Sequence, residues 1–277
     1  MNRLFTILCM VSLLVFHTTC NASVMDLESP DTEIKTRAAE QRVQNLIQQA
    51  RQGDVEAYNS LALCYRDGDG VEKNWLNMIC MYAIYSQKTG EDIEDVVELF
   101  DEGHHFRLLF EIMDSPFFNE EIEAKLEQLK QSAPAEAKAI EAAKKAFSME
   151  EATSALSTIR EAEDEGSELA VIFQVIYYDK VKDKTGLEEY LTRIVEKYPF
   201  FNLLLGESYA RKYSETGDFS YIQKAIECYY KADAYGMLVP KYANLLWGMY
   251  DYFGQKGMLE YDEQEVERLK VLGKITH

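Results

Sequence analysis

The sequence predicts an all-α protein, for three reasons. The 277 residues are 47% hydrophobic, so the chain is long enough to bury a core as one domain or two. Proline and glycine interrupt helices, and the chain has only 5 prolines and a modest 14 glycines. The composition therefore favours helix over most of the chain. Apolar residues recur at spacings of three and four along most of the chain, which is the period of a helix with one buried face.

Residues 1–22 predict a signal peptide or a lipoprotein signal. The apolar run from Leu4 to Phe16 follows Arg3 and is shorter than the roughly 20 residues that a spanning helix needs, so we expect export. The stretch from His17 to Cys20 resembles the box of bacterial lipoproteins in part, which implies lipidation of Cys20. Ordinary signal cleavage after Ala22 is the alternative.

The stretch LALCYRDGDGVEKNWLNMICMY, residues 61–82, predicts a helical hairpin rather than a calcium loop. When Gly70 takes the glycine position of a calcium loop, a tyrosine and a leucine fall where the first and last carboxylate ligands belong. As a turn the stretch needs no ligand. Gly68 and Gly70 supply the positive φ that ends one helix, and Asn74 is placed to cap the next one.

The same segment resembles one SEL-one-like repeat, a relative of the tetratricopeptide repeat. A second copy covers residues 205–236, and residues 241–253 are similar to the first helix of another. The resemblance implies a right-handed α-solenoid of about five or six antiparallel helix hairpins over residues 23–277, with a candidate hinge near 132–135. The residues that carry the first copy are Ala57, Leu61, Ala62, Tyr65, Gly68, Gly70, Val71, Asn74, Met78, Tyr82 and Gly90.

Two capping boxes predict helix starts in the middle of the chain, where the repeat pattern is weaker. A capping box pairs a hydroxyl side chain with a glutamate three residues later, and each satisfies a free backbone N–H of the first turn. The two boxes are Ser148 with Glu151, and Thr185 with Glu188.

No catalytic, cofactor or metal pattern stands out, so we expect neither an enzyme nor a bound cofactor. His104 and His105 are the best metal candidates, but neighbouring residues on a helix point about 100° apart and would not easily share an ion. Three cysteines outside residues 1–22 lack metal-ligand spacing and are expected as buried apolar residues, namely Cys64, Cys80 and Cys228. Most tyrosines and phenylalanines fall at helix-packing positions and are expected in the core.

The charge and the export signal together suggest a class of function. A net charge of −19 disfavours nucleic acid and anionic lipid as partners and leaves a basic partner open. We therefore expect a non-enzymatic protein–protein interaction scaffold of the bacterial cell envelope, in the periplasm or held at the outer membrane by a lipid anchor. A ligand- or glycan-binding envelope lipoprotein is the alternative. A metal-dependent hydrolase centred on His104 and His105 is a more distant one.

The resemblance also implies where a protein or peptide partner binds. In tetratricopeptide-like repeats the first helix of each hairpin lines a concave groove, at positions set by the leucine that faces the core. Here those leucines are Leu61 and Leu205, and apolar residues on an open groove are natural contact points unless neighbouring helices cover them. The predicted partner-binding residues are Glu56, Asn59, Leu63, Arg66, Leu203 and Glu207.

Overall fold

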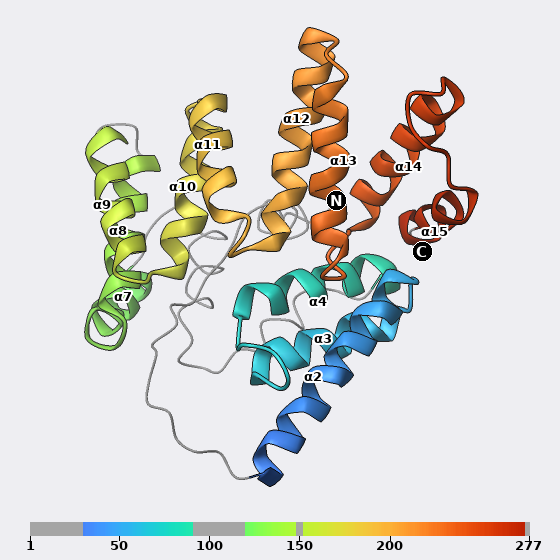
Figure 1. Ribbon diagram of the computed structural model, residues 1–277. Helices are drawn as coiled ribbons and strands as arrows, with labels where there is room; N and C mark the ends of the chain where they lie inside the picture. The colour runs from blue at the N-terminus through green and yellow to red at the C-terminus, as the bar shows by residue number, and fades with distance from the viewer. Residues whose placement is uncertain (1–29, 91–119, 148–151, 275–277) are drawn as a thin grey trace. The chain divides into compact units, whose positions relative to one another are not determined.

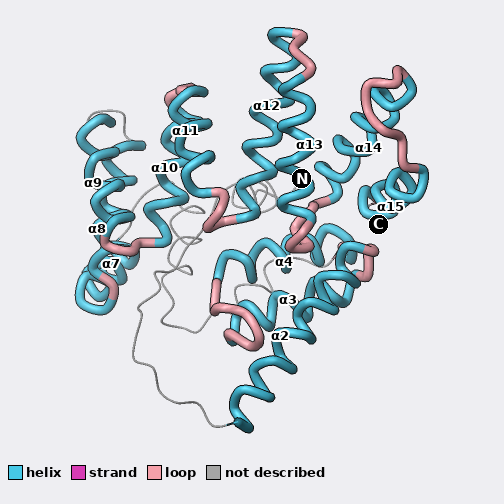
Figure 2. Tube along the Cα trace, in the orientation of Figure 1, coloured by secondary structure: helices cyan, strands magenta, loops and turns pink. Residues whose placement is uncertain are grey.

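The computed structural model describes residues 30–90, 120–147 and 152–274, and within these ranges it contains helices and turns but no strand (Figures 1 and 2). The all-α prediction is therefore confirmed. Residues 1–22, His104, His105 and the Ser148–Glu151 box lie outside the described residues. The elements are α2 (Pro30–Arg51), α3 (Val55–Asp67), α4 (Trp75–Thr89), α7 (Glu120–Ser132), α8 (Pro134–Phe147), α9 (Ala152–Asp164), α10 (Glu168–Lys180), α11 (Lys184–Ile194), the 3-10 helix η1 (Pro199–Phe201), α12 (Asn202–Thr216), α13 (Ser220–Asp233), α14 (Pro240–Gln255) and α15 (Glu263–Gly273).

The described helices belong to two compact units. Unit 1 contains α7 to α10 and α11 as far as Tyr190. Unit 2 contains α2 to α4 together with the chain from Leu191 onward, which includes α12 to α15. The units divide at 91/92 and at 190/191. The segment 132–135, where a hinge is expected from the sequence, is the turn between α7 and α8 inside unit 1.

The hairpin predicted from residues 61–82 is confirmed as α3 and α4. Gly68 ends α3 in the left-handed conformation with φ 75°, and Gly70 has the same φ. Asn74 caps α4, because its side chain accepts hydrogen bonds from the N–H groups of Leu76 (3.1 Å) and Asn77 (2.9 Å). A Cβ atom at position 70 would lie 2.4 Å from the backbone of Ala39, so glycine also allows α2 to pack against the turn.

Two further hairpins, α12 with α13 and α14 with α15, occupy the region of the second predicted copy and the helix after it. Leu205 in α12 is buried as expected, and Leu246 in α14 is buried as well. Gly206 permits close packing between α12 and α13, since a Cβ there would lie 2.5 Å from the ring of Tyr229. Tyr229 is itself fully buried.

Unit 2 joins helices from both ends of the chain. The ammonium group of Lys88 in α4 donates a hydrogen bond to the carbonyl oxygen of Leu272 in α15 (2.9 Å). The loop after α13 approaches α2 closely, because a Cβ on Gly236 would touch Ala50 at 3.4 Å. In a strictly consecutive array each repeat contacts only its sequence neighbours. Figure 1 shows instead that α2, α3 and α4 lie beside the C-terminal helices, so the helices of unit 2 do not pack strictly in sequence order.

Unit 1 is assembled from contacts between helices that are close in sequence. Lys130 of α7 pairs with Glu141 of α8 (2.7 Å), and α8 packs against both α9 and α10. The helix start predicted at Thr185 is wrong by two residues. Asp183 occupies that role, since its carboxylate accepts from the N–H of Gly186 (2.9 Å), and Thr185 lies inside α11.

Candidate functional site

Two of the six predicted partner-binding residues, Leu203 and Glu207, lie on α12. The prediction that Leu203 faces an open groove is wrong, because its side chain is 0% exposed in the first turn of the helix. Glu207 accepts hydrogen bonds from the hydroxyl of Tyr242 (2.8 Å) and the ammonium of Lys241 (3.0 Å). Burial raises the pKa of the Glu207 carboxyl, but these hydrogen bonds outweigh burial and leave the pKa below its usual value. Glu207 therefore has a structural role between α12 and α14.

The other four predicted residues lie on α3, away from its buried face. Glu56 is exposed, whereas Asn59, Leu63 and Arg66 are partly exposed. Arg66 forms an ion pair with its neighbour Asp67 (2.7 Å). The part of the predicted surface that remains accessible is therefore confined to one helix, and it contains one apolar side chain.

A different surface, formed by the end of α14 and the start of α15, gathers more apolar residues. Seven large hydrophobic side chains are exposed among the described residues, and six of them lie between positions 235 and 271. Tyr252, Met258 and Tyr261, with exposed fractions of 52%, 44% and 48%, lie within ten residues of one another. Tyr261 packs its ring over Gly254, where an added Cβ would meet it at 2.8 Å. We call residues 250–265 the α14–α15 surface.

The α14–α15 surface contains an open hollow of about 580 Å³. Two tyrosines, Tyr250 and Tyr261, contribute aromatic surface to its lining, and acidic side chains dominate the remainder. Such a combination suits a cationic group, which is attracted both by carboxylates and by the faces of aromatic rings. The lining residues are Tyr250, Glu260, Tyr261, Asp262, Glu263, Gln264 and Glu265.

One cation of the chain already occupies an aromatic face of this surface. The ammonium nitrogen of Lys256 lies 3.9 Å from the ring centroid of Tyr252 and 2.5 Å from its hydroxyl oxygen. Asp262 has a local role instead, because it caps α15 by accepting from the N–H groups of Gln264 (2.9 Å) and Glu265 (3.1 Å). Glu260 and Glu263 are exposed, and no hydrogen bond or ion pair to another described residue engages them.

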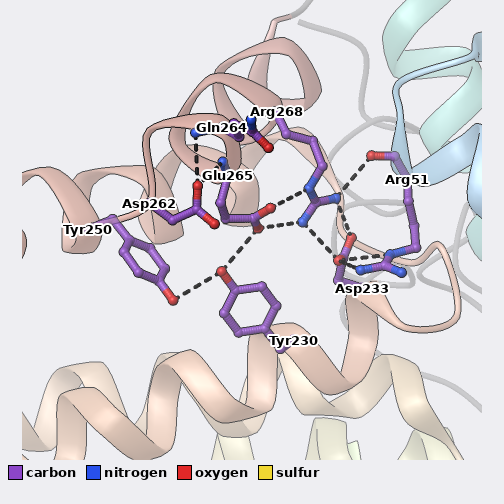
Figure 3. Close-up of polar contacts among 8 residues, drawn as sticks. All are labelled: Arg51, Tyr230, Asp233, Tyr250, Asp262, Gln264, Glu265 and Arg268. Atoms are coloured by element: carbon purple, nitrogen blue, oxygen red, sulfur yellow. Dashed lines mark hydrogen bonds and ion pairs between the residues drawn. The ribbon is translucent and has the colours of Figure 1, made fainter. Parts of the chain in front are cut away.

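A buried ionic cluster fixes α15 against two other helices of unit 2 (Figure 3). Asp233, at the end of α13, is 1% exposed and binds the guanidinium of Arg268 through both of its oxygens, at 3.1 and 2.9 Å. Arg51, at the end of α2, donates to the same carboxylate (3.1 Å). Arg268 also donates to the carbonyl oxygen of Arg51 (3.0 Å), so three helices meet at one carboxylate.

The cluster continues from Arg268 to the wall of the hollow. Arg268 donates hydrogen bonds to both carboxylate oxygens of Glu265, at 2.7 and 2.6 Å. The hydroxyl of Tyr230 is hydrogen-bonded to the carboxylate of Glu265 (3.0 Å) and to the hydroxyl of Tyr250 (3.1 Å). Burial lowers the pKa of the Arg268 guanidinium, but hydrogen bonds to Glu265 and Asp233 outweigh it and hold the pKa above its usual value. Burial and the hydrogen bond with Tyr250 raise the pKa of the Tyr230 hydroxyl. The guanidinium of Arg268 therefore stays charged, and the cluster holds two residues that line the hollow, Glu265 and Tyr250, in position.

Sequence reasoning missed both the cluster and the α14–α15 surface. Arg51 and Asp233 are 182 residues apart, and each looks like an ordinary surface charge in its own helix. The signal that could have found the surface is the density of aromatic and acidic residues between positions 250 and 265.

The three buried cysteines, Cys64, Cys80 and Cys228, are free thiols, as expected. Within the described ranges no group of three or more histidine, cysteine, aspartate or glutamate side chains is placed to hold a metal ion. None of the described helices is both long and apolar enough to cross a lipid bilayer. No protein-family model matches the chain, and the searches of curated proteins and of solved structures found no match. The resemblance to SEL-one-like repeats stays a prediction.

Proposed function

We propose that the protein is a non-enzymatic interaction scaffold that binds a protein partner through the α14–α15 surface. The observation that supports this most is that Tyr252, Met258 and Tyr261 are all exposed within ten residues of the chain, at the end of α14 and in the connection to α15. Contiguous exposed apolar groups mark interaction sites more often than scattered ones, and tyrosine is enriched among the residues that dominate binding energy. The buried cluster around Asp233 supports the proposal further, because a surface that is held in position binds at a lower entropic cost.

The proposed location is the bacterial cell envelope. Residues 1–22 have the pattern of an export signal, and Cys20 or the bond after Ala22 is the proposed processing point. If Cys20 carries the lipid, Cys20→Ala shifts the protein from the membrane fraction to the soluble fraction and abolishes fatty-acid labelling. A mature chain that begins at Ser23 would show that no lipid is attached at Cys20.

A second candidate function is glycan binding in the same hollow. Tyr250 and Tyr261 could stack on sugar rings while the carboxylates of Glu260 and Glu263 accept hydrogen bonds from sugar hydroxyl groups. This candidate uses the same residues as the scaffold proposal, so binding experiments with soluble oligosaccharides distinguish the two.

Site-specific photo-crosslinking in the native host tests the scaffold proposal. A photoreactive amino acid replaces one exposed residue at a time, and the scaffold proposal predicts protein adducts from positions 252, 258 and 261. Val181 is the matched control, because it is an exposed apolar residue in unit 1. The α3 surface is included as the competing site, with probes at Glu56, Asn59, Leu63 and Arg66.

The distribution of adducts decides between the surfaces. Adducts from positions 252, 258 and 261 but not from position 181 support binding at the α14–α15 surface. Adducts from the α3 positions alone would move the site to the surface predicted from the repeat resemblance. Equal labelling at every position would contradict a specific scaffold, since it is the result expected of random collision.

A further inference from the structure

We propose that the partner presents a basic, amphipathic segment to the α14–α15 surface, with an arginine or lysine side chain in the hollow and apolar side chains on Tyr252 and Met258. This inference rests on the proposed function and specifies the chemistry of the partner. Two observations support it: the net negative charge of the α14–α15 surface, and the contact between the ammonium of Lys256 and the ring of Tyr252 on that surface.

The charge of the α14–α15 surface is strongly one-sided. Between positions 250 and 265 there are five carboxylates and one lysine, which gives a net charge of −4. Glu265 is neutralised by Arg268, and Asp262 caps its own helix. Glu260 and Glu263 remain exposed, without a cationic partner among the described residues. A bound guanidinium or ammonium group would supply the missing positive charge beside them.

The position of Lys256 shows that this surface can hold a cation on an aromatic ring. Its ammonium lies over Tyr252, and the ring of Tyr261, five residues after Lys256, packs over Gly254. Tyr261 and Tyr250 present rings to the hollow without such a cation from the described residues. A cation–π contact contributes roughly 0.5–1 kcal/mol at an exposed site and more when the cation is desolvated.

A second copy of the chain and a neutral glycan fit this surface less well. Two copies that met face to face would bring two negative surfaces together, which costs free energy through like-charge repulsion. A neutral glycan would desolvate Glu260 and Glu263 without balancing their charges. Met258 and Tyr252 are exposed, and the apolar side chains of an amphipathic segment would cover them.

Fluorescence anisotropy with a short labelled peptide of alternating arginine and leucine tests the inference. The probe for charge specificity is the same peptide with glutamate in place of arginine. We expect the full protein to bind the arginine–leucine peptide and not the glutamate–leucine peptide. We also expect affinity to fall when the salt concentration is raised about tenfold, because exposed charge pairs are screened.

Matched charge variants localise the binding. The triple variant Glu260→Gln, Asp262→Asn, Glu263→Gln keeps an asparagine cap on α15 and should weaken peptide binding at least about tenfold. The control Glu40→Gln, Asp218→Asn, Glu227→Gln changes the net charge equally in unit 2, and Asp218 likewise accepts from a helix N-terminal N–H, that of Ser220 (2.9 Å). Its affinity should stay within about twofold of the wild type.

Gly254→Ala tests the aromatic part without removing a charge. The added methyl group would meet Tyr261 at 2.8 Å and displace its ring, whereas alanine is favoured in a helix, so we expect weaker peptide binding in a folded protein. Retained helical circular dichroism and an unchanged unfolding midpoint check the fold of every variant.

The outcomes separate this inference from the proposed function. Equal loss of binding in both triple variants would overturn the inference, since binding would then follow net charge alone. Binding of malto- or chito-oligosaccharides in place of the peptide would overturn it in favour of a glycan. If no peptide binds but crosslinks still form at positions 252, 258 and 261, the inference fails and the scaffold proposal survives. If both experiments fail, both proposals are wrong.

Discussion

Units 1 and 2 each bury an acidic side chain where helices meet, Glu136 in unit 1 and Asp233 in unit 2, but the two side chains are stabilised differently. In unit 1 Glu136 of α8 is 5% exposed and accepts hydrogen bonds from three neutral donors at the start of α10. Those donors are the hydroxyl of Ser167 (2.5 Å) and the N–H groups of Glu168 (2.8 Å) and Leu169 (3.1 Å) at the start of α10. In unit 2 Asp233 accepts from two arginines.

The difference follows from which helix end each carboxylate meets. Glu136 lies at the N-terminus of α10, where free N–H groups and the helix dipole favour a negative charge. Asp233 belongs to the last turn of its own helix α13, where the dipole disfavours a negative charge. Cationic partners are therefore needed, and in unit 2 they come from distant parts of the sequence. Unit 1 is closed by a local cap, and unit 2 by a long-range ionic cluster.

The largest expected effect is that of Asp233→Asn in unit 2. This change leaves Arg51 and Arg268 near a buried amide, and breaking a buried ion pair costs about 3–5 kcal/mol. Urea unfolding followed by circular dichroism measures the loss of unfolding free energy. Glu267→Gln on α15 is the control, because Glu267 is exposed and should change stability little. A similar small effect for Asp233→Asn would mean that the cluster does not hold unit 2 together.

Glu136→Gln in unit 1 is expected to lower the free energy of unfolding less, by about 1–2 kcal/mol. The amide oxygen of glutamine can still accept from the α10 terminus, but its NH₂ group must face one of the three donors. Urea unfolding followed by circular dichroism measures this loss of unfolding free energy as well. A cost equal to that of Asp233→Asn would remove the distinction between a helix cap in unit 1 and an ionic cluster in unit 2.

A still smaller effect is expected for the double variant Asp67→Asn, Asp69→Asn in the α3–α4 turn. Both aspartates pair with arginines on the surface, Asp67 with Arg66 and Asp69 with Arg42, and exposed pairs contribute little to stability. Thermal unfolding should show a smaller shift than that of Glu136→Gln. A calcium-dependent increase in melting temperature that the double variant abolishes would instead support a calcium loop.

The smallest effect concerns the acid dependence of stability, at Glu207. Its pKa is lower in the folded protein than the usual value of 4.5, so it stabilises unit 2 above that pH, and this stabilisation is lost as pH falls through the lowered pKa. Glu207→Gln should therefore flatten the dependence of stability on pH below about 4.5. Acid titration followed by circular dichroism measures this. An unchanged acid transition would show that the hydrogen bonds from Tyr242 and Lys241 do not favour the charged form.

Local rules predicted the parts of the fold that depend on a few neighbouring residues. Gly68, Gly70 and Asn74 each have a conformational or capping role that their residue types specify, so the α3–α4 hairpin could be predicted. At Thr185 the same rules failed, because Asp183 is an equally good cap two residues earlier. Both outcomes come from the same short-range chemistry.

The candidate site could not be predicted in this way, because it depends on long-range packing. The groove spacing placed Leu203 on a surface, whereas the helical turn η1 leads α12 into the core and buries that residue. Most aromatic residues were expected in the core, whereas Tyr252 near the end of α14 and Tyr261 in the following connection are about half exposed. The partners of Asp233 cannot be read from its own helix, since Arg51 belongs to the other end of the chain.

Hydrogen–deuterium exchange with and without the arginine–leucine peptide tests most directly whether the α14–α15 surface is the binding site. We predict slower amide exchange within residues 245–265 when the peptide is present, and no change in α3 or in unit 1. Protection of residues 56–66 without any change at 245–265 would contradict the account and place the interaction on α3 instead.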